Sequence, residues 1–395
     1  MSVEFISAIN VNPANELNRL GLAAIDVPYL ERYARTLEDG GFDYTLVGYS
    51  SAMHDPFTIA ASVARFTERL RPIVALRPNT VQPTVAARAL ATLDQLSAGR
   101  AVVHIISGGD DHEQAREGDR LSKPQRYERS AEYIRILRQV WASSDPVDHA
   151  GTYYSFEDFA SLVRPVQDRI PVSVGGSSLD AYRVGGALGD IFGLWGEPLK
   201  ETAEQIHAVA EQARIAGRTD TPRTWVTFRP IVAPTDELAW EKAHRILAVL
   251  AERSGSATPL WRQRRPADGS GPQNAGSQRA LEIAGRQDLH DRALWTPTTT
   301  ATGGLGASSA LVGSYETVAA AILDYVDLGA DLVSIRGYDN LNDAIDYGRY
   351  IIPLVRQELA HRAATGRRGT VVAQPPLDSL PHAASATDAA LSKAS

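Results

Sequence analysis

The chain has 395 residues, 44% of them hydrophobic, which is enough for one large core or two ordinary domains. Its 40 lysines and arginines and 47 aspartates and glutamates give a formal net charge of -7, which argues against a nucleic-acid or anionic-membrane partner. The absence of cysteine excludes disulfides, zinc–cysteine sites and thiol chemistry. No apolar run has membrane-spanning length, and Met1 to Asn10 is too short and polar for a signal peptide, so we expect a cytoplasmic protein.

Short apolar segments alternate with helical patterns along the chain. The predicted strands cover residues 3–9, 44–47, 72–76, 101–106, 172–174, 191–193, 225–232 and 332–335. The predicted helices cover residues 29–38, 57–66, 83–96, 124–141, 198–215, 238–253, 317–328 and 344–359. Eight such units predict an α/β fold, a closed (β/α)8 TIM barrel with insertions. An open Rossmann-like sheet is the alternative, but no GxGxxG motif opens a helix after the first strand.

The helix that begins at Pro83 carries apolar residues at helical spacing. Val85, Leu90, Leu93 and Leu96 predict its buried face.

Two later segments interrupt the regular alternation of strands and helices. Residues 254–309 are rich in Gly, Ser, Thr, Pro and Arg, with one helical island at 278–285, and we expect a mobile lid on the catalytic face. We therefore expect one domain at 1–362, and an Ala/Ser/Pro-rich mobile tail at 363–395.

Two loops after predicted strands suggest a site. The strand at 101–106 ends in Ser107-Gly108-Gly109-Asp110-Asp111, and polar residues at the carboxyl ends of parallel strands are where α/β enzymes place their sites. An ordinary βαβ unit with a polar exit loop is the plain alternative. Gly175-Gly176-Ser177-Ser178 opens a helix, where backbone amides bind anions and glycine admits a phosphate. The alternative there is a capped helix, since serine is a good N-cap.

Several motifs occur in a characteristic order: ALRP, PTVAAR, ATLDQLSAGR, SGG, QRYERSAEY, GGSS, LWGEP, ALVG and GY. Together they resemble the flavin-dependent alkanesulfonate monooxygenases of the bacterial-luciferase-like TIM-barrel family. The resemblance covers roughly the whole chain before the tail. It implies reduced FMN as cofactor, O2 as co-substrate and an organosulfonate as substrate, which is broken down to sulfite and an aldehyde.

The resemblance also implies residues that hold the flavin. Gly176, Ser177, Ser178 and Tyr127 match positions near the FMN phosphate, and His104 and Ser107 match an Asn and a Thr that line the flavin ring. His104 departs from the family pattern and would give the ring a titratable neighbour. A satisfied core histidine and an amphipathic-helix tyrosine are the structural alternatives.

On the substrate side, Trp195 matches a pocket wall, and Tyr338, which ends the eighth strand, could donate from the barrel mouth. Simple packing is the alternative for both rings. Met53 replaces a family cysteine beside His54, which we count among the catalytic candidates. A sulfonate needs a fixed cation, and arginine suits it because its guanidinium is a planar, permanently charged fork. Arg77 and Arg229 lie at strand ends and are the candidates.

We therefore expect a two-component enzyme. Because no dinucleotide fingerprint is present, a separate NAD(P)H:FMN reductase should supply the reduced flavin. A homodimer or homotetramer is expected, and no metal ligands are assigned. A relative that oxidises a sulfone or an organonitrogen compound, a deazaflavin (F420)-dependent dehydrogenase, and a non-catalytic flavin-binding protein are the alternatives.

Overall fold

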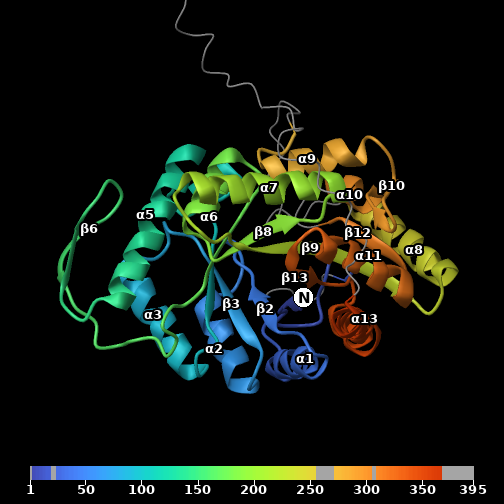
Figure 1. Cartoon of the computed structure of the whole chain (residues 1–395), viewed down its shortest axis with the longest axis horizontal. Coiled ribbons are helices and arrows are strands. Elements are labelled where there is room, and N and C mark those ends of the chain that lie inside the picture. Colours follow the sequence, from blue (N-terminus) through green and yellow to red (C-terminus); the bar gives the residue numbers. More distant parts are fainter. Residues whose placement is uncertain (1, 19–23, 255–270, 305–307, 367–395) are drawn as a thin grey trace, which may run out of the picture.

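The computed structural model describes residues 2–18, 24–254, 271–304 and 308–366. Parallel strands close into a barrel in the order β1-β2-β3-β4-β7-β8-β9-β13, with β13 pairing back to β1 (Figure 1). The strands are β1 (Glu4–Ala8), β2 (Tyr44–Val47), β3 (Arg71–Leu76), β4 (Val102–Ile105), β7 (Val172–Gly175), β8 (Ile191–Trp195), β9 (Arg223–Ala233) and β13 (Ala330–Ile335). All eight overlap the predicted strands, which confirms the TIM-barrel fold.

Helices surround the barrel. They are α1 (Val27–Asp39), α2 (Pro56–Phe66), α3 (Pro83–Leu96), α5 (Lys123–Ala142), α6 (Leu179–Leu188), α7 (Leu199–Ile215), α8 (Asp236–Ser254), α11 (Tyr315–Asp327), α12 (Asn340–Asp346) and α13 (Ile352–Thr365). Several begin at side-chain caps, as where Asp55 accepts from the backbone N–H of Thr58 at 2.8 Å. The single closing helix predicted at 344–359 is wrong in detail, because the π-helical turn η1 (Tyr347–Ile351) separates α12 from α13.

The core has an inner and an outer layer. The barrel interior is filled by large apolar side chains, one from almost every strand: Ile6, Tyr44, Ile73, Val102, Ile191, Trp225 and Leu332. On α3, Leu90 and Leu93 are buried as predicted, but Val85 and Leu96 are 44% and 64% exposed. The predicted stripe was wrong at both ends because small residues (Ala86, Ala87 and Ala91) form much of the buried face of the helix instead.

Strand β9 belongs to two sheets. Its first half, through Phe228, pairs with β8 and β13 inside the barrel. Its second half, from Arg229 to Ala233, pairs in parallel with β12 (Ala310–Ser314), which the sequence analysis did not predict as a strand. The long strand therefore continues beyond the barrel into a second, smaller sheet.

The segment expected to be an irregular lid is largely regular where it is described. It forms α9 (Ala275–Ala284), β10 (Leu289–His290), β11 (Leu294–Trp295) and α10 (Pro297–Thr302), and β11 pairs with β12. The helical island predicted at 278–285 is confirmed by α9, but the expectation of irregular chain around it is wrong for the rest of residues 271–304. Its remaining stretches at 255–270 and 305–307, and the tail from 367, lie outside the described residues.

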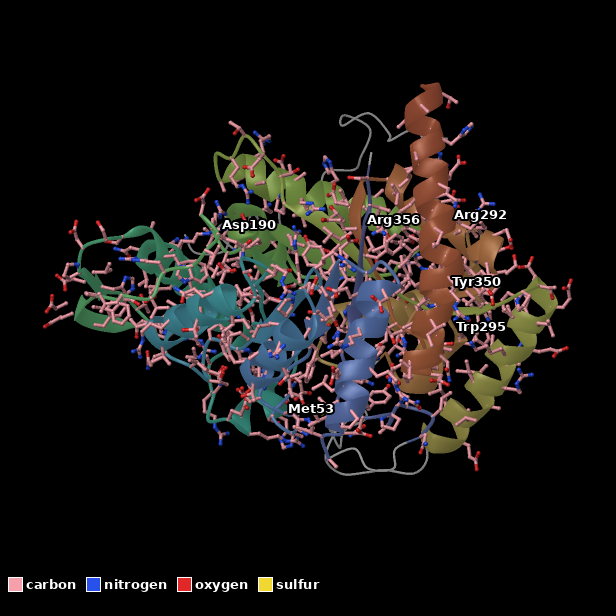
Figure 2. The ribbon with its side chains drawn as sticks, turned by 90° about the horizontal axis from the view of Figure 1, so that it is seen from below. Met53, Asp190, Arg292, Trp295, Tyr350 and Arg356 are labelled. Atoms are coloured by element: carbon pink, nitrogen blue, oxygen red, sulfur yellow. The ribbon has the colours of Figure 1, made fainter. Side chains whose placement is uncertain are left out.

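Two short additions complete the fold. The helix α4 (Asp111–Ala115) follows β4, and a hairpin of β5 (Val147–Ala150) and β6 (Ser155–Phe159) lies beside α5 (Figure 1). Figure 2 marks the two ends of the barrel: Met53, after β2, lies on the carboxyl-end side, and Asp190, before β8, lies on the opposite side. In the part of the chain that the structure describes, no helix is long and apolar enough to span a membrane.

Candidate active site

The turn between β7 and α6 forms a tight cradle. Gly176 has φ +137°, which favours glycine, and a Cβ atom there would lie 2.9 Å from both the Tyr127 hydroxyl oxygen and the Ala181 methyl group. Ser178 caps α6, since its Oγ accepts from the backbone N–H of Ala181 at 3.3 Å. Burial raises the pKa of the Tyr127 hydroxyl, which is hydrogen-bonded to Ser178. The structure therefore brings Tyr127, Gly176, Ser177 and Ser178 together at one helix N-terminus, as a phosphate site requires.

A cation that was not among the predicted site residues lies beside this cradle. Lys123 lies four residues before Tyr127 on α5, so the two side chains share one face of the helix. Burial lowers the pKa of its ammonium, although Asp180 at the start of α6 and Asp111 act in the opposite direction. The four-residue spacing between Lys123 and Tyr127 could have indicated that the lysine lies beside the tyrosine. Lys123 was not predicted because it lies outside the motifs that carry the family resemblance.

His104 points into the barrel. Its Nδ1 lies 2.9 Å from Ser173 Oγ, and its ring centroid lies 5.4 Å from that of Trp225. Burial lowers the pKa of His104 to about 4, so the ring is neutral at physiological pH. Gly175 and Gly193 leave room beside it, because Cβ atoms there would lie 3.2 and 3.7 Å from its Cε1. A planar, uncharged neighbour is chemically suited to a flavin ring.

Ser107 is buried at the exit of β4 but points toward α5. Its Oγ lies 2.8 Å from Ser130 Oγ, and its carbonyl accepts from Arg126 Nε at 3.0 Å. Its hydroxyl therefore fixes the β4 exit loop onto α5. Ser107 would therefore affect a ligand indirectly, by fixing the position of the β4 exit loop, and not by a contact from its own hydroxyl.

Arg229 is buried and its guanidinium is already paired. Nη1 and Nη2 donate to the two carboxylate oxygens of Glu16 at 3.1 and 3.3 Å, while Nε and Nη2 donate to the carbonyls of Arg336 and Gly337 at 2.9 and 2.7 Å. Tyr338 lies beneath it, 4.0 Å from the guanidinium carbon to the ring centroid. Direct sulfonate binding by Arg229 therefore does not fit this arrangement.

Tyr338 also differs from the expectation. Its ring packs in a second apolar cluster with Ile231, Trp295 and Val312, behind Arg229. It does not line the cavity at the strand ends that is described below. The expected donor at the barrel mouth is instead a packed aromatic residue beneath a cation.

Arg77 is neutralised in the same manner. Its Nη1 donates to Glu117 at 2.9 Å and its Nη2 to Glu113 at 3.1 Å, and its side chain is 6% exposed. The guanidinium carbon lies 4.9 Å from the centroid of the Tyr49 ring. Arg116 Nη1 also pairs with Glu113, at 3.1 Å, so two guanidinium groups and two carboxylates balance, and Arg77 is not the excess positive charge that an anionic substrate needs.

Trp195, at the end of β8, lies under the inserted segment. A Cβ atom on Gly276 of α9 would lie 2.9 Å from the Trp195 ring. The same segment reaches the β4 exit loop, because Gln273 Oε1 accepts from the backbone N–H of Asp111 at 2.9 Å. Residues 273–276 therefore extend from the β4 exit to the β8 exit, past the end of β7 between them.

A cavity of about 410 Å³ lies at the carboxyl ends of β1 and β2. His54 and Met53 line one side of it, and Glu16 and Arg336 line another. Arg336 directly follows β13 and was not among the predicted site residues, although the same strand-end argument had selected Arg77.

A second hollow, of about 530 Å³, lies between α11 and α13 on the outer ring of helices. The described residues contain no group of side chains that could hold a metal ion.

The model of the luciferase-like monooxygenase family matches residues 8–332. The chain belongs to this family. Luciferase-like enzymes of this kind are flavin-dependent monooxygenases, which agrees with the cradle at Gly176 and the neutral ring of His104.

Solved structures share the fold at low identity. One is a riboflavin lyase with modified FMN and riboflavin, at 19% identity over 91% of this chain and 92% of that chain, with a TM-score of 0.74. The EDTA monooxygenase from Chelativorans sp. BNC1 has 18% identity, coverage of 91% and 94%, and a TM-score of 0.72. An F420-dependent secondary alcohol dehydrogenase has 18% identity, coverage of 90% and 100%, and a TM-score of 0.64. At these identities the likeness establishes the fold alone.

Proposed function

We propose that this luciferase-like protein is a two-component monooxygenase that uses reduced FMN and O2 to release sulfite from an organosulfonate, leaving an aldehyde. A separate NAD(P)H:FMN reductase supplies the reduced flavin. The observation that carries the flavin assignment is the cradle at the start of α6, where Gly176, Ser178 and Tyr127 meet. A side chain at Gly176 would fill the space beside the tyrosine hydroxyl.

The residues present fit FMN. The α6 N-terminus and Tyr127 would hold its phosphate, with Lys123 as a cation on the same face of α5. His104 would lie against the ring system as a neutral group and fix it over the barrel interior. Bound reduced flavin supplies the activation of O2. The chain's own part is to orient the ring, to hold the substrate's reacting carbon near it, and to exclude water with residues 273–276.

The test is an aerobic assay with FMN, a flavin reductase, NAD(P)H and a panel of alkanesulfonates. Sulfite should be released in proportion to the reduced flavin consumed. Flavin oxidation without sulfite from any sulfonate would contradict the desulfonation, and peroxide measured in parallel would account for that flavin.

A second candidate is a monooxygenase for an anionic organonitrogen compound. The fold likeness to an EDTA monooxygenase and the cavity with Arg336 in its wall favour it. The same assay separates the two when anionic organonitrogen compounds are added to the panel, because such a substrate would be consumed without release of sulfite. An F420-dependent dehydrogenase would oxidise its substrate only when F420 is supplied as hydride acceptor, and a non-catalytic flavin-binding protein would leave every substrate unchanged while the reduced flavin is oxidised to give peroxide.

A further inference from the structure

The inference concerns the cavity at the ends of β1 and β2 and the charges in its wall. Glu16 lies between two arginines: Arg229 binds both of its oxygens, and Arg336 Nη2 donates to Oε1 at 2.8 Å. Two guanidinium groups thus face one carboxylate, and the cluster keeps one positive charge in excess. Asp343, a neighbouring carboxylate, is neutralised by Lys242 at 2.7 Å.

The excess charge is accessible at Arg336. The donors of Arg229 are used by Glu16 and two carbonyls, and its side chain is 5% exposed. The Arg336 side chain is 29% exposed, and among the described residues only Glu16 accepts from its guanidinium. An incoming anion can therefore reach Arg336 but not Arg229, and Arg336 retains unused N–H donors for it.

The rest of the cavity is largely apolar. Its wall includes Ile9, Val11, Val47, Met53 and Ile59, and its uncharged polar side chains are those of Asn10, Asn12, Asn15, Tyr49 and His54. A volume of about 410 Å³ falls in the range of about 300–1,000 Å³ that is usual for small-molecule sites. One excess cation on a mainly apolar wall is complementary to an organic anion with an aliphatic tail, and the asparagines can donate further hydrogen bonds to its head group.

We propose that Arg336 binds the anionic head group of the substrate, and that the cavity at β1 and β2 selects an aliphatic monoanion over neutral and short polar compounds. This inference rests on the proposed function, because it assigns the substrate-binding part of the same site. Glu16 and Arg229 act as positioning residues: the carboxylate orients the Arg336 fork, and Arg229 holds the carboxylate.

The test compares two probes of similar size under anaerobic conditions with reduced FMN bound. They are 1-hexanesulfonate and the neutral methyl pentyl sulfone, titrated by calorimetry. Arg336→Gln should weaken hexanesulfonate binding at least tenfold and change sulfone binding less than twofold, with FMN affinity unchanged. Arg336→Lys should fall between the wild type and Arg336→Gln, because it keeps the charge but loses the planar fork. Arg35→Gln is the matched control, since Arg35 forms one arginine–glutamate pair on the exposed surface of α1.

Two results would overturn the inference: unchanged hexanesulfonate affinity in Arg336→Gln, or an equal loss for both probes. If Arg336→Gln does not fold, as judged by circular dichroism, wild-type affinity in a folded Arg336→Lys would overturn it as well. The proposed function fails separately. Charge-selective binding without sulfite release would contradict desulfonation but support the anion site. Sulfite release with an unchanged KM in Arg336→Gln would support desulfonation but contradict the anion site.

Discussion

Glu16 binds Arg229 through both carboxylate oxygens, at 3.1 and 3.3 Å, and so joins the β1 exit loop to strand β9. We predict that Glu16→Gln lowers the free energy of unfolding by about 3 kcal/mol, because removing one partner of a buried pair leaves the other charge uncompensated. The estimate is at the lower end for such pairs because Glu16 is 32% exposed. Urea denaturation gives the value. Glu31→Gln, which breaks the exposed pair with Arg35, should cost less than about 1 kcal/mol.

The same pair predicts a pH dependence. Burial opposes ionisation of Glu16, but the charges of Arg229 and Arg336 outweigh it and hold its pKa well below the usual range. A depressed carboxyl pKa stabilises the fold above the unfolded-state value of about 4.3, and this stabilisation is lost as the pH falls below it. The stability difference between wild type and Glu16→Gln should therefore be constant from pH 8 to 6 and shrink below about pH 4. A difference that grew on acidification would contradict this.

His104 predicts a second pH effect, at higher pH. Its folded pKa of about 4 lies below the unfolded value of about 6.5, so the unfolded chain takes up the proton first. His104 should therefore destabilise the fold progressively as the pH falls from about 6.5 toward 4. His104→Asn should remove this component of the pH dependence of Tm. An imidazole resonance of His104 that titrated near pH 6.5 would refute the burial argument directly.

The cradle at α6 predicts selectivity for the phosphate. Lys123→Gln and Tyr127→Phe should each weaken FMN binding by about 1.5–3 kcal/mol, the range for hydrogen bonds to charged groups, and leave riboflavin binding nearly unchanged. Riboflavin lacks the phosphate, so it isolates that contact. Fluorescence titration with both flavins measures the difference. Lys200→Gln, on the exposed side of α7, is the control, and parallel losses for FMN and riboflavin would place the lysine and tyrosine elsewhere on the flavin.

The contact between α9 and Trp195 predicts a steric effect. In Gly276→Ala the new Cβ would lie 2.9 Å from the Trp195 ring, so the ring or the helix must shift. Overpacking of this kind costs about 1–3 kcal/mol. The variant should lower Tm and shift tryptophan emission. Gly285→Ala, at the end of the same helix, meets only ordinary contacts at 3.4 Å and should do neither.

The barrel strands could be predicted because they are short apolar runs at regular intervals. β12 could not: Ala310–Ser314 is small and glycine-containing, and it becomes a strand only because β9 continues past the barrel and offers it a partner. The predicted burial of Val85 and Leu96 was wrong for a related reason, since helical spacing identifies an apolar stripe but not which small residues are buried beside it.

The candidate site divides in the same way. Gly176 and Ser178 could be brought together from the sequence because a strand end and a helix start fix them locally, whereas Tyr127, on α5, was linked to them only by the family resemblance. The role of Arg229 could not, because its partner Glu16 lies 213 residues away in a loop without periodicity. The strand pattern predicted that Arg229 lies toward the carboxyl ends of the strands, but it contained no information on which carboxylate would neutralise it.

Strand β9 bonds to β8 and β13 through its first half and to β12 through its second. The insertion is therefore part of the same sheet system as the barrel. Deleting residues 271–304 would remove β11 from its pairing with β12, and the apolar edge of β12 would then be exposed to pairing with other chains. Local unfolding of the small sheet would loosen the strand that carries Arg229. The barrel and its insertion should therefore exchange their amide hydrogens as one cooperative unit. A substitution that destabilises the insertion should also destabilise β9 near Arg229, because the same strand runs through both sheets.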